Sequence, residues 1–105
     1  MVDRIETGVS SEGLAISPDG NWVATTNLER SYLPYTDPRV TWFSSITLAR
    51  FDQTTDQLEK VGDFNYDGIL PEAAVFDNSS QFLAVANYDH FDDRISGSSI
   101  DFWRI

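Results

Sequence analysis

The residue types best suited to ligand binding lie in one irregular segment, residues 28–43. Its two prolines, Pro34 and Pro38, disfavour both a regular helix and a central strand. Aromatic rings combine apolar area with a polar edge and arginine offers a planar fork, so together they suit a sugar or a peptide. The candidate ligand-binding residues of this segment are Arg30, Tyr32, Tyr35, Arg39 and Trp42. The alternative is that the aromatic rings only pack onto neighbouring strands.

The only histidine, His90, lies in a second irregular segment, residues 88–97, among Asp89, Asp92 and Asp93. We count His90 as a further candidate ligand-binding residue. A histidine among carboxylates can hold a divalent metal or act as a base. The alternative is a solvated acidic loop.

A third pattern, Asp63-Phe-Asn65-Tyr-Asp67-Gly68, matches the first half of a calcium loop, in which oxygens at alternate positions precede a glycine. Position twelve is Ala74 where the loop needs a glutamate, so an edge strand is the favoured interpretation. We therefore predict no metal site and no cofactor, with a divalent cation as the alternative. No Ser-His-Asp arrangement, phosphate loop or spaced carboxylate pair identifies catalytic residues.

The elements that carry these segments repeat within the chain. Residues 14–27, LAISPDGNWVATTN, return sixty positions later as residues 74–87, AVFDNSSQFLAVAN. Residues 44–51, SSITLARF, return as residues 98–105, SSIDFWRI, at an offset of 54. The offsets differ because the segments after Asn27 and Asn87 differ in length, and length changes confined to loops are typical of structural repeats.

No window has the periodicity and caps of a helix, so the sequence predicts an all-β fold. Pro18-Asp19-Gly20 predicts a tight hairpin turn, with the glycine in the left-handed conformation. The predicted strands are 2–7, 14–17, 22–27, 45–52, 58–66, 73–76, 82–87 and 98–105.

The repeat resembles that of the lactonase-like β-propellers, part of the broad WD40-like group. Their blades read as an apolar strand, Ser-Pro-Asp-Gly, an apolar strand ending in Asn, and a Ser-Ile strand, as residues 14–27 and 44–51 do here. The resemblance implies two four-stranded blades in a single unit, 1–105, with repeats at 8–66 and 67–105 and strand 2–7 completing a blade. Asn78 and Ser80 depart from the turn motif, and no catalytic residue of the family corresponds to a residue here.

Two blades alone would leave two apolar sheet faces in water, because the predicted strands are apolar on both sides. One solution is a head-to-tail ring of identical chains: a dimer with four blades, a trimer with six or a tetramer with eight. The alternative is that the chain is part of a larger propeller.

The composition and charge of the chain limit the classes of partner that it can bind. The formal net charge is −10, and no basic cluster exists to bind nucleic acid or an anionic membrane. The chain has no cysteine, no signal-peptide pattern and no long apolar run, so we expect a soluble protein, cytoplasmic by default.

In a propeller blade the tight turns emerge on one side and the long loops on the other. The long loops, 28–43 and 88–97, should therefore share one face, and loops on a rigid scaffold are where binding residues gather. We predict a binding or interaction module that presents this face to a small ligand, a glycan or a protein. The alternative is a lactonase-like hydrolase, or a fragment of one, with a divalent metal in the central channel. Asn27 and Asn87 could serve either function.

Overall fold

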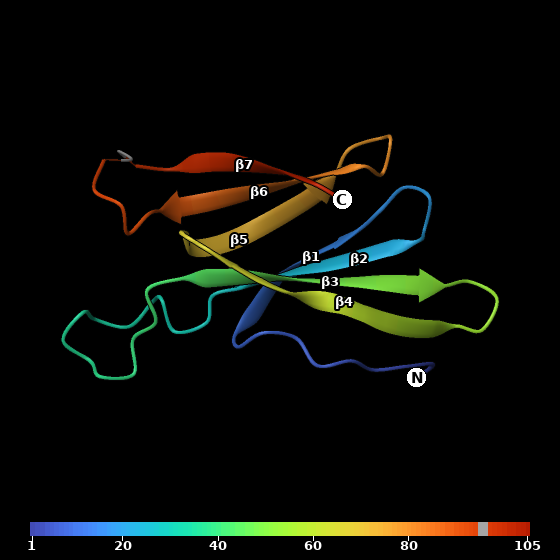
Figure 1. Ribbon diagram of the computed structural model, residues 1–105, viewed down its shortest axis with the longest axis horizontal. Helices are drawn as coiled ribbons and strands as arrows, with labels where there is room; N and C mark the ends of the chain where they lie inside the picture. Colours follow the sequence, from blue (N-terminus) through green and yellow to red (C-terminus); the bar gives the residue numbers. More distant parts are fainter. Residues whose placement is uncertain (95–96) are drawn as a thin grey trace.

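The structure is a computed structural model that describes residues 1–94 and 97–105. These residues form seven strands and no helix, which confirms the predicted all-β fold. The first sheet holds β1 (Ser11–Ile16), β2 (Trp22–Asn27), β3 (Ser44–Asp52) and β4 (Gln57–Tyr66). The second sheet holds β5 (Ile69–Phe76), β6 (Phe82–Asp89) and β7 (Ser99–Arg104). Both sheets are antiparallel and open, with their strands in chain order, like two successive propeller blades (Figure 1).

The β1–β2 hairpin closes as the sequence predicts. The amide of Ser17 donates to the carbonyl of Trp22 at 2.9 Å, and Gly20 has a φ of 77°, in the left-handed region. In the second repeat Ser80 takes the place of Gly20 and adopts a φ of 62°, which is costly for a residue with a side chain. Asp77 compensates, because its carboxylate accepts hydrogen bonds from the backbone amides of residues 79, 81 and 82. A hydrogen bond from the Ser79 hydroxyl, and after it these backbone bonds, lower the pKa of Asp77.

A β-bulge falls at the same repeat position in both sheets. It lies between Ser11 and Gly13 in β1 and between Pro71 and Ala73 in β5, sixty positions later. Bulges bend a strand and strengthen its twist, and here they shape the first strand of each sheet, which is an edge strand. The repeat therefore extends to local irregularities as well as to the apolar pattern.

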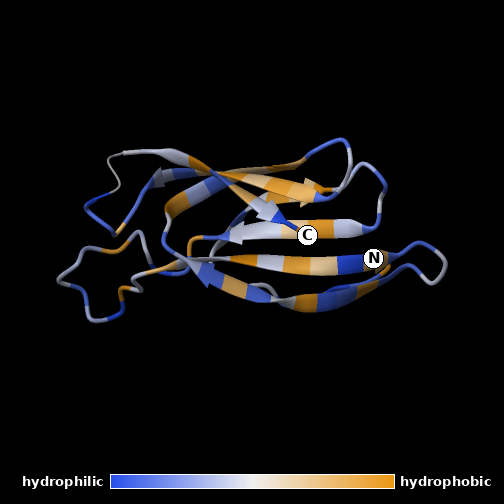
Figure 2. Cartoon of the chain, turned by 45° about the horizontal axis from the view of Figure 1, so that its top comes forward, coloured by the Kyte–Doolittle hydropathy of each residue, from blue (hydrophilic) through white to orange (hydrophobic). Residues whose placement is uncertain are grey.

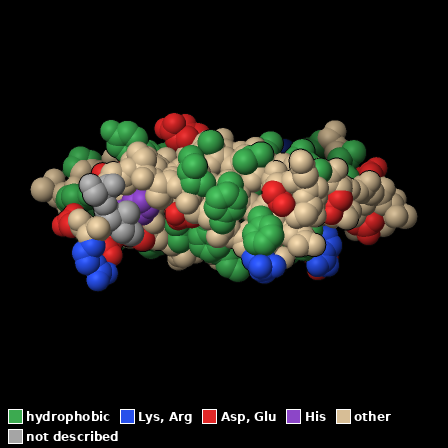
Figure 3. All heavy atoms as spheres, turned by 90° about the horizontal axis from the view of Figure 1, so that it is seen from above, with side chains coloured by type: hydrophobic (Ala, Val, Ile, Leu, Met, Phe, Trp, Pro, Cys, Tyr) green, Lys and Arg blue, Asp and Glu red, His purple; other side chains and the backbone are tan. Residues whose placement is uncertain are grey.

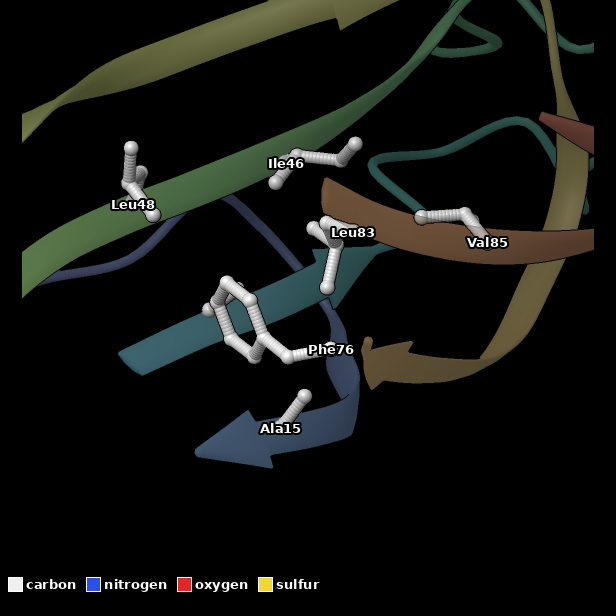
Figure 4. Packing of buried hydrophobic residues seen from close by; sticks show 7 residues of the cluster. Ala15, Ile46, Leu48, Phe76, Leu83 and Val85 are labelled. Atoms are coloured by element: carbon white, nitrogen blue, oxygen red, sulfur yellow. The ribbon is translucent and has the colours of Figure 1, made fainter. Parts of the chain in front are cut away.

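The hydrophobic core lies between the two sheets. Side chains from the first sheet point toward Phe76 of β5 and toward Leu83 and Val85 of β6 (Figure 4). Leu83 is 1% exposed. The buried apolar residues of the first sheet in this core are Ala15, Ala24, Ile46 and Leu48. Because each sheet contributes about half of this core, neither sheet can bury its inner face without the other.

The strand predicted at residues 2–7 is not present, and this corrects the predicted pair of four-stranded blades. Residues 1–7 belong to neither sheet; they run along the first sheet on the side away from β5–β7 (Figure 1). The Asp3 carboxylate accepts from the amide of Leu58 at 2.7 Å, and Ile5 lies in a trough beside Val23 and Ala49. Apolar burial on β2 and β3 thus takes the place of backbone pairing, and the second sheet has three strands among the described residues.

Strand β5 begins at Ile69, four residues before the strand predicted at 73–76. The added part contains Pro71, which cannot donate a backbone hydrogen bond. The proline is tolerated because β5 is an edge strand that pairs only with β6.

The connections separate into two groups, as predicted for blades. The tight turns at 17–21, 53–56 and 77–81 lie at one end of the molecule and the longer loops 28–43 and 90–98 at the other (Figure 1). The turns are mainly hydrophilic (Figure 2). In the part of the chain that the structure describes, no helix is long and apolar enough to cross a membrane.

Candidate functional site

Three aromatic rings gather at the long-loop end. Tyr35 and Trp42 stack with their ring centroids 5.0 Å apart and an interplanar angle of 27°. Phe91, from the loop of the second repeat, lies 5.5 Å from Trp42 and 6.2 Å from Tyr35, centroid to centroid. Tyr35 and Trp42 remain 62% and 57% exposed. We call these three residues the aromatic cluster; it offers stacking surface to solvent and joins the two repeats.

Asp67 positions Phe91 within this cluster. Its two carboxylate oxygens accept hydrogen bonds from the backbone amides of Phe91, at 2.7 Å, and of Asp92, at 3.2 Å. Asp67 lies in the turn between β4 and β5, so the loop after β6 is fixed to the rigid sheets at this point. Sequence reasoning missed Phe91 because nothing local distinguishes it from any other aromatic residue in an acidic loop.

The two arginines predicted as ligand-binding residues, Arg30 and Arg39, make contacts within their own loop. Arg39 donates to Asp37 through Nε at 3.1 Å and through Nη2 at 2.9 Å. This guanidinium lowers the pKa of Asp37 to about 2. The backbone of Arg30 pairs with Thr41 and closes the base of the loop. Arg30 and Tyr32 are exposed in the same loop, and Tyr32 lies outside the stacked cluster.

His90 faces inward instead of joining the exposed rings. It is 7% exposed, with Nδ1 3.1 Å from the carbonyl oxygen of Gly97 and Nε2 2.8 Å from the hydroxyl of Ser99. Because a carbonyl only accepts, Nδ1 donates to Gly97 and carries a proton. The Ser99 hydroxyl donates to a carboxylate oxygen of Asp101 at 3.0 Å, so Asp101 and His90 Nε2 are alternative acceptors for its single proton. The structure therefore contains a Ser-His contact that the sequence did not reveal, nine positions apart.

Asn27, at the end of β2, has all four hydrogen-bonding positions of its side chain occupied, and it is 0% exposed. Its Oδ1 accepts from Ser11 at 2.6 Å and from Thr25 at 2.9 Å. Its Nδ2 donates to Ser45 and to Thr47, both at 2.9 Å. A saturated, buried amide of this kind holds the loop end of the first sheet together and is not available to a ligand.

Asn87 occupies the same position in the second sheet with different partners. Its Oδ1 accepts from the hydroxyl of Tyr66 at 2.8 Å, and its Nδ2 donates to Ser99 at 3.3 Å. Burial raises the pKa of Tyr66 above its ordinary value, so the hydroxyl stays a donor. Gly8 and Gly68, sixty positions apart, lie against the two asparagines: an added Cβ would lie 2.7 Å from Asn27 Nδ2 and 2.9 Å from Asn87 Oδ1.

The acidic clusters do not converge on a metal position. Asp63 bonds to Lys60 at 2.6 Å and to Thr47 at 2.6 Å, away from the amides that Asp67 holds. Asp92 pairs with Arg94 at 2.8 Å. Within residues 1–94 and 97–105, no group of three or more histidine or carboxylate side chains is placed to hold a metal ion.

Comparisons with known proteins bear on the fold. No protein-family model matches the chain, and no curated protein matches it. Among solved structures, the periplasmic gluconolactonase of Pseudomonas aeruginosa superposes with a TM-score of 0.67 at 17% sequence identity. The match covers 97% of this chain and 26% of that one, so the chain spans about a quarter of the lactonase. The likeness supports a β-propeller-like, loosely lactonase-like fold for the two sheets.

Proposed function

We propose that the chain is a binding module whose aromatic cluster stacks on a neutral, ring-shaped ligand, with a glycan as the first class to test. The observation that carries the proposal is the exposed pair Tyr35 and Trp42, held by Phe91 from the other repeat. Aromatic faces stack well on the apolar faces of sugar rings and on peptide side chains. Asp37, Asp92 and Asp93 lie in the same loops, and the net charge of −10 disfavours an anionic ligand.

The test is titration of the protein with a panel of neutral mono- and oligosaccharides. Binding is measured by the change in tryptophan fluorescence and by calorimetry. The Trp42→Ala variant should bind at least about ten times more weakly than the parent, because it removes the central ring of the stack. Tyr32→Ala is the matched control, an exposed aromatic residue of the same loop outside the cluster, and its affinity should stay within about two-fold. Equal affinities of the parent and of Trp42→Ala would exclude the cluster as the binding surface.

A second candidate function, ester or lactone hydrolysis, is favoured by the Ser99–His90 contact and by the activity named for the Pseudomonas protein. Ser99 lines a surface hollow together with Glu72 and Tyr88. In such a reaction Oγ attacks the carbonyl carbon and His90 Nε2 takes the hydroxyl proton. The ring C–O bond then breaks as His90 Nε2 gives that proton to the leaving ring oxygen. Water, deprotonated by His90, then attacks the serine ester, and the proton returns to Ser99 Oγ as the hydroxy acid leaves.

Hydrolysis of a lactone panel and of p-nitrophenyl acetate tests this candidate. The expected result is measurable turnover that falls to the buffer rate in Ser99→Ala and is unchanged in Ser98→Ala. A Ser99→Ala variant as active as the parent, or a parent without turnover, would leave the Ser99–His90 contact as a structural hydrogen bond.

A further inference from the structure

The outer face of the second sheet is apolar and open. Val75, Ile100 and Phe102 are 63%, 68% and 71% exposed. Val75 and Ile100 line a shallow hollow floored by alanines of β5 and β6. Seen from the β7 side, hydrophobic side chains stand exposed between the loop end and the turn end (Figure 3). An exposed apolar face of this kind on a small domain is typical of a surface that packs against a partner.

The internal repeat indicates what such a partner looks like. Val75 corresponds to Ala15 at the offset of 60, and Ile100 and Phe102 correspond to Ile46 and Leu48 at the offset of 54. Ala15, Ile46 and Leu48 are the residues with which the first sheet packs onto the second. The exposed outer face of β5–β7 therefore corresponds to the face of the first sheet that packs on the second sheet in the core.

The complementary face is also present on the molecule. Within the core, Ala15, Ile46 and Leu48 pack on Phe76 and Leu83. At the offset of 60, Phe76 and Leu83 correspond to Ile16 and Val23. Ile16 and Val23 lie on the outer face of the first sheet, where they line a hollow of about 550 Å³ together with Phe51 and Leu58.

We propose that the outer face of β5–β7 docks head to tail on the outer face of β1–β4 of a second copy of this chain. The contact continues the internal interface by one repeat. It places Val75 of one copy against Ile16 of the next, and Ile100 and Phe102 against Val23. Such a contact is heterologous and closes as a ring of two, three or four copies. The inference does not depend on the ligand proposed above.

Residues 2–7 cover part of the receiving face, so they move when the second copy docks. The internal repeat indicates where residues 2–7 lie in the docked pair. Asp3 and Gly8 correspond to Asp63 and Gly68, so residues 2–7 hold the position of residues 62–67, the end of the strand that pairs with β3. In the docked pair they take the equivalent place beside β7 of the neighbouring copy. That edge of β7 pairs with no strand in the described part of the chain.

Light scattering on a size-exclusion column, over a concentration series, tests the docking. The parent should have the mass of two, three or four chains, and Ile100→Asp should have the mass of one chain. Because Ile100 is exposed in the single copy, circular dichroism should show an unchanged fold for that variant. Tyr32→Asp, in a loop away from both faces, is the control and should keep the parental mass. A monomeric parent at every concentration would overturn the proposal, and so would an Ile100→Asp variant of parental mass.

Cross-linking tests the polarity of the contact. The chain has no cysteine, so the Ile16→Cys/Val75→Cys double variant carries only the two introduced thiols. These positions lie on opposite outer faces, and a short bis-maleimide should join them between copies and not within one. The expected product is a ladder of joined chains, with Ile16→Cys alone and Val75→Cys alone remaining unjoined. Dimers formed by either single variant would mean that like faces meet, which contradicts head-to-tail docking.

Discussion

Replacing Leu83 by alanine is expected to lower the free energy of unfolding by about 3 kcal/mol, within the range of about 2–5 kcal/mol for leucine deletions in packed cores. Leu83 is 1% exposed and points from β6 into the core shared by the two sheets (Figure 4). The cavity cannot be refilled easily, because the facing residues, Ile46 and Leu48, are fixed in the central part of β3. Urea unfolding followed by tryptophan fluorescence measures the loss.

Val61→Ala provides the comparison for Leu83→Ala. Val61 is an exposed apolar residue of β4, and its truncation should cost less than about 1 kcal/mol. Trp22 in the first sheet and Trp103 in the second are both packed against the shared core. A single unfolding transition that shifts as a whole in Leu83→Ala would show that the sheets unfold together. Two separate transitions, with only one displaced, would contradict the shared core.

Asn27→Ala should be nearly as damaging, although it removes no apolar surface. The variant loses four hydrogen bonds at a position with no exposure to water. Each such bond contributes about 0.5–1.5 kcal/mol net, so we expect a loss of about 3 kcal/mol in the free energy of unfolding. Thermal and urea unfolding of the variant provide the measurement.

Asn65→Ala is the control for Asn27→Ala, because Asn65 is exposed on β4 and its truncation should change stability by less than about 0.5 kcal/mol. Hydrogen exchange adds a local readout. In Asn27→Ala the amide of Gly8, which donates to Thr47 at 3.0 Å within the same network, should exchange faster. A variant as stable as the parent would show that water replaces the lost amide at this end of the sheet.

Most of the fold could be predicted from the sequence, because it follows from local patterns. The turn at Pro18-Asp19-Gly20 and the alternation in β2, β3 and β6 are properties of short segments. Residues 2–7 are not a strand in the single chain, contrary to the prediction, for the opposite reason. Their weak alternation suits a strand, but whether they pair with β7 or lie on β2 and β3 depends on which surface is available.

The candidate site was only partly predictable. Tyr35 and Trp42 were identified as a pair of aromatic residues in one loop, and the structure brings them together. Phe91 joins them through contacts between the repeats, which no local pattern encodes. His90 was identified by its type, but its inward direction depends on Gly97 and Ser99 as hydrogen-bond partners.

The two long loops leave the sheets from matching anchor points. The β2–β3 ladder ends on the pair Asn27 and Ser45, and the β6–β7 ladder reaches the corresponding pair, Asn87 and Ser99. The six-residue difference between the repeats is thus absorbed entirely beyond these anchors, without any change of register. One pattern of strand pairing therefore carries loops of two lengths. Sequence drift or deliberate grafting between the anchors can therefore change the loop surface, which includes the proposed binding surface, while the pairing of the strands is kept.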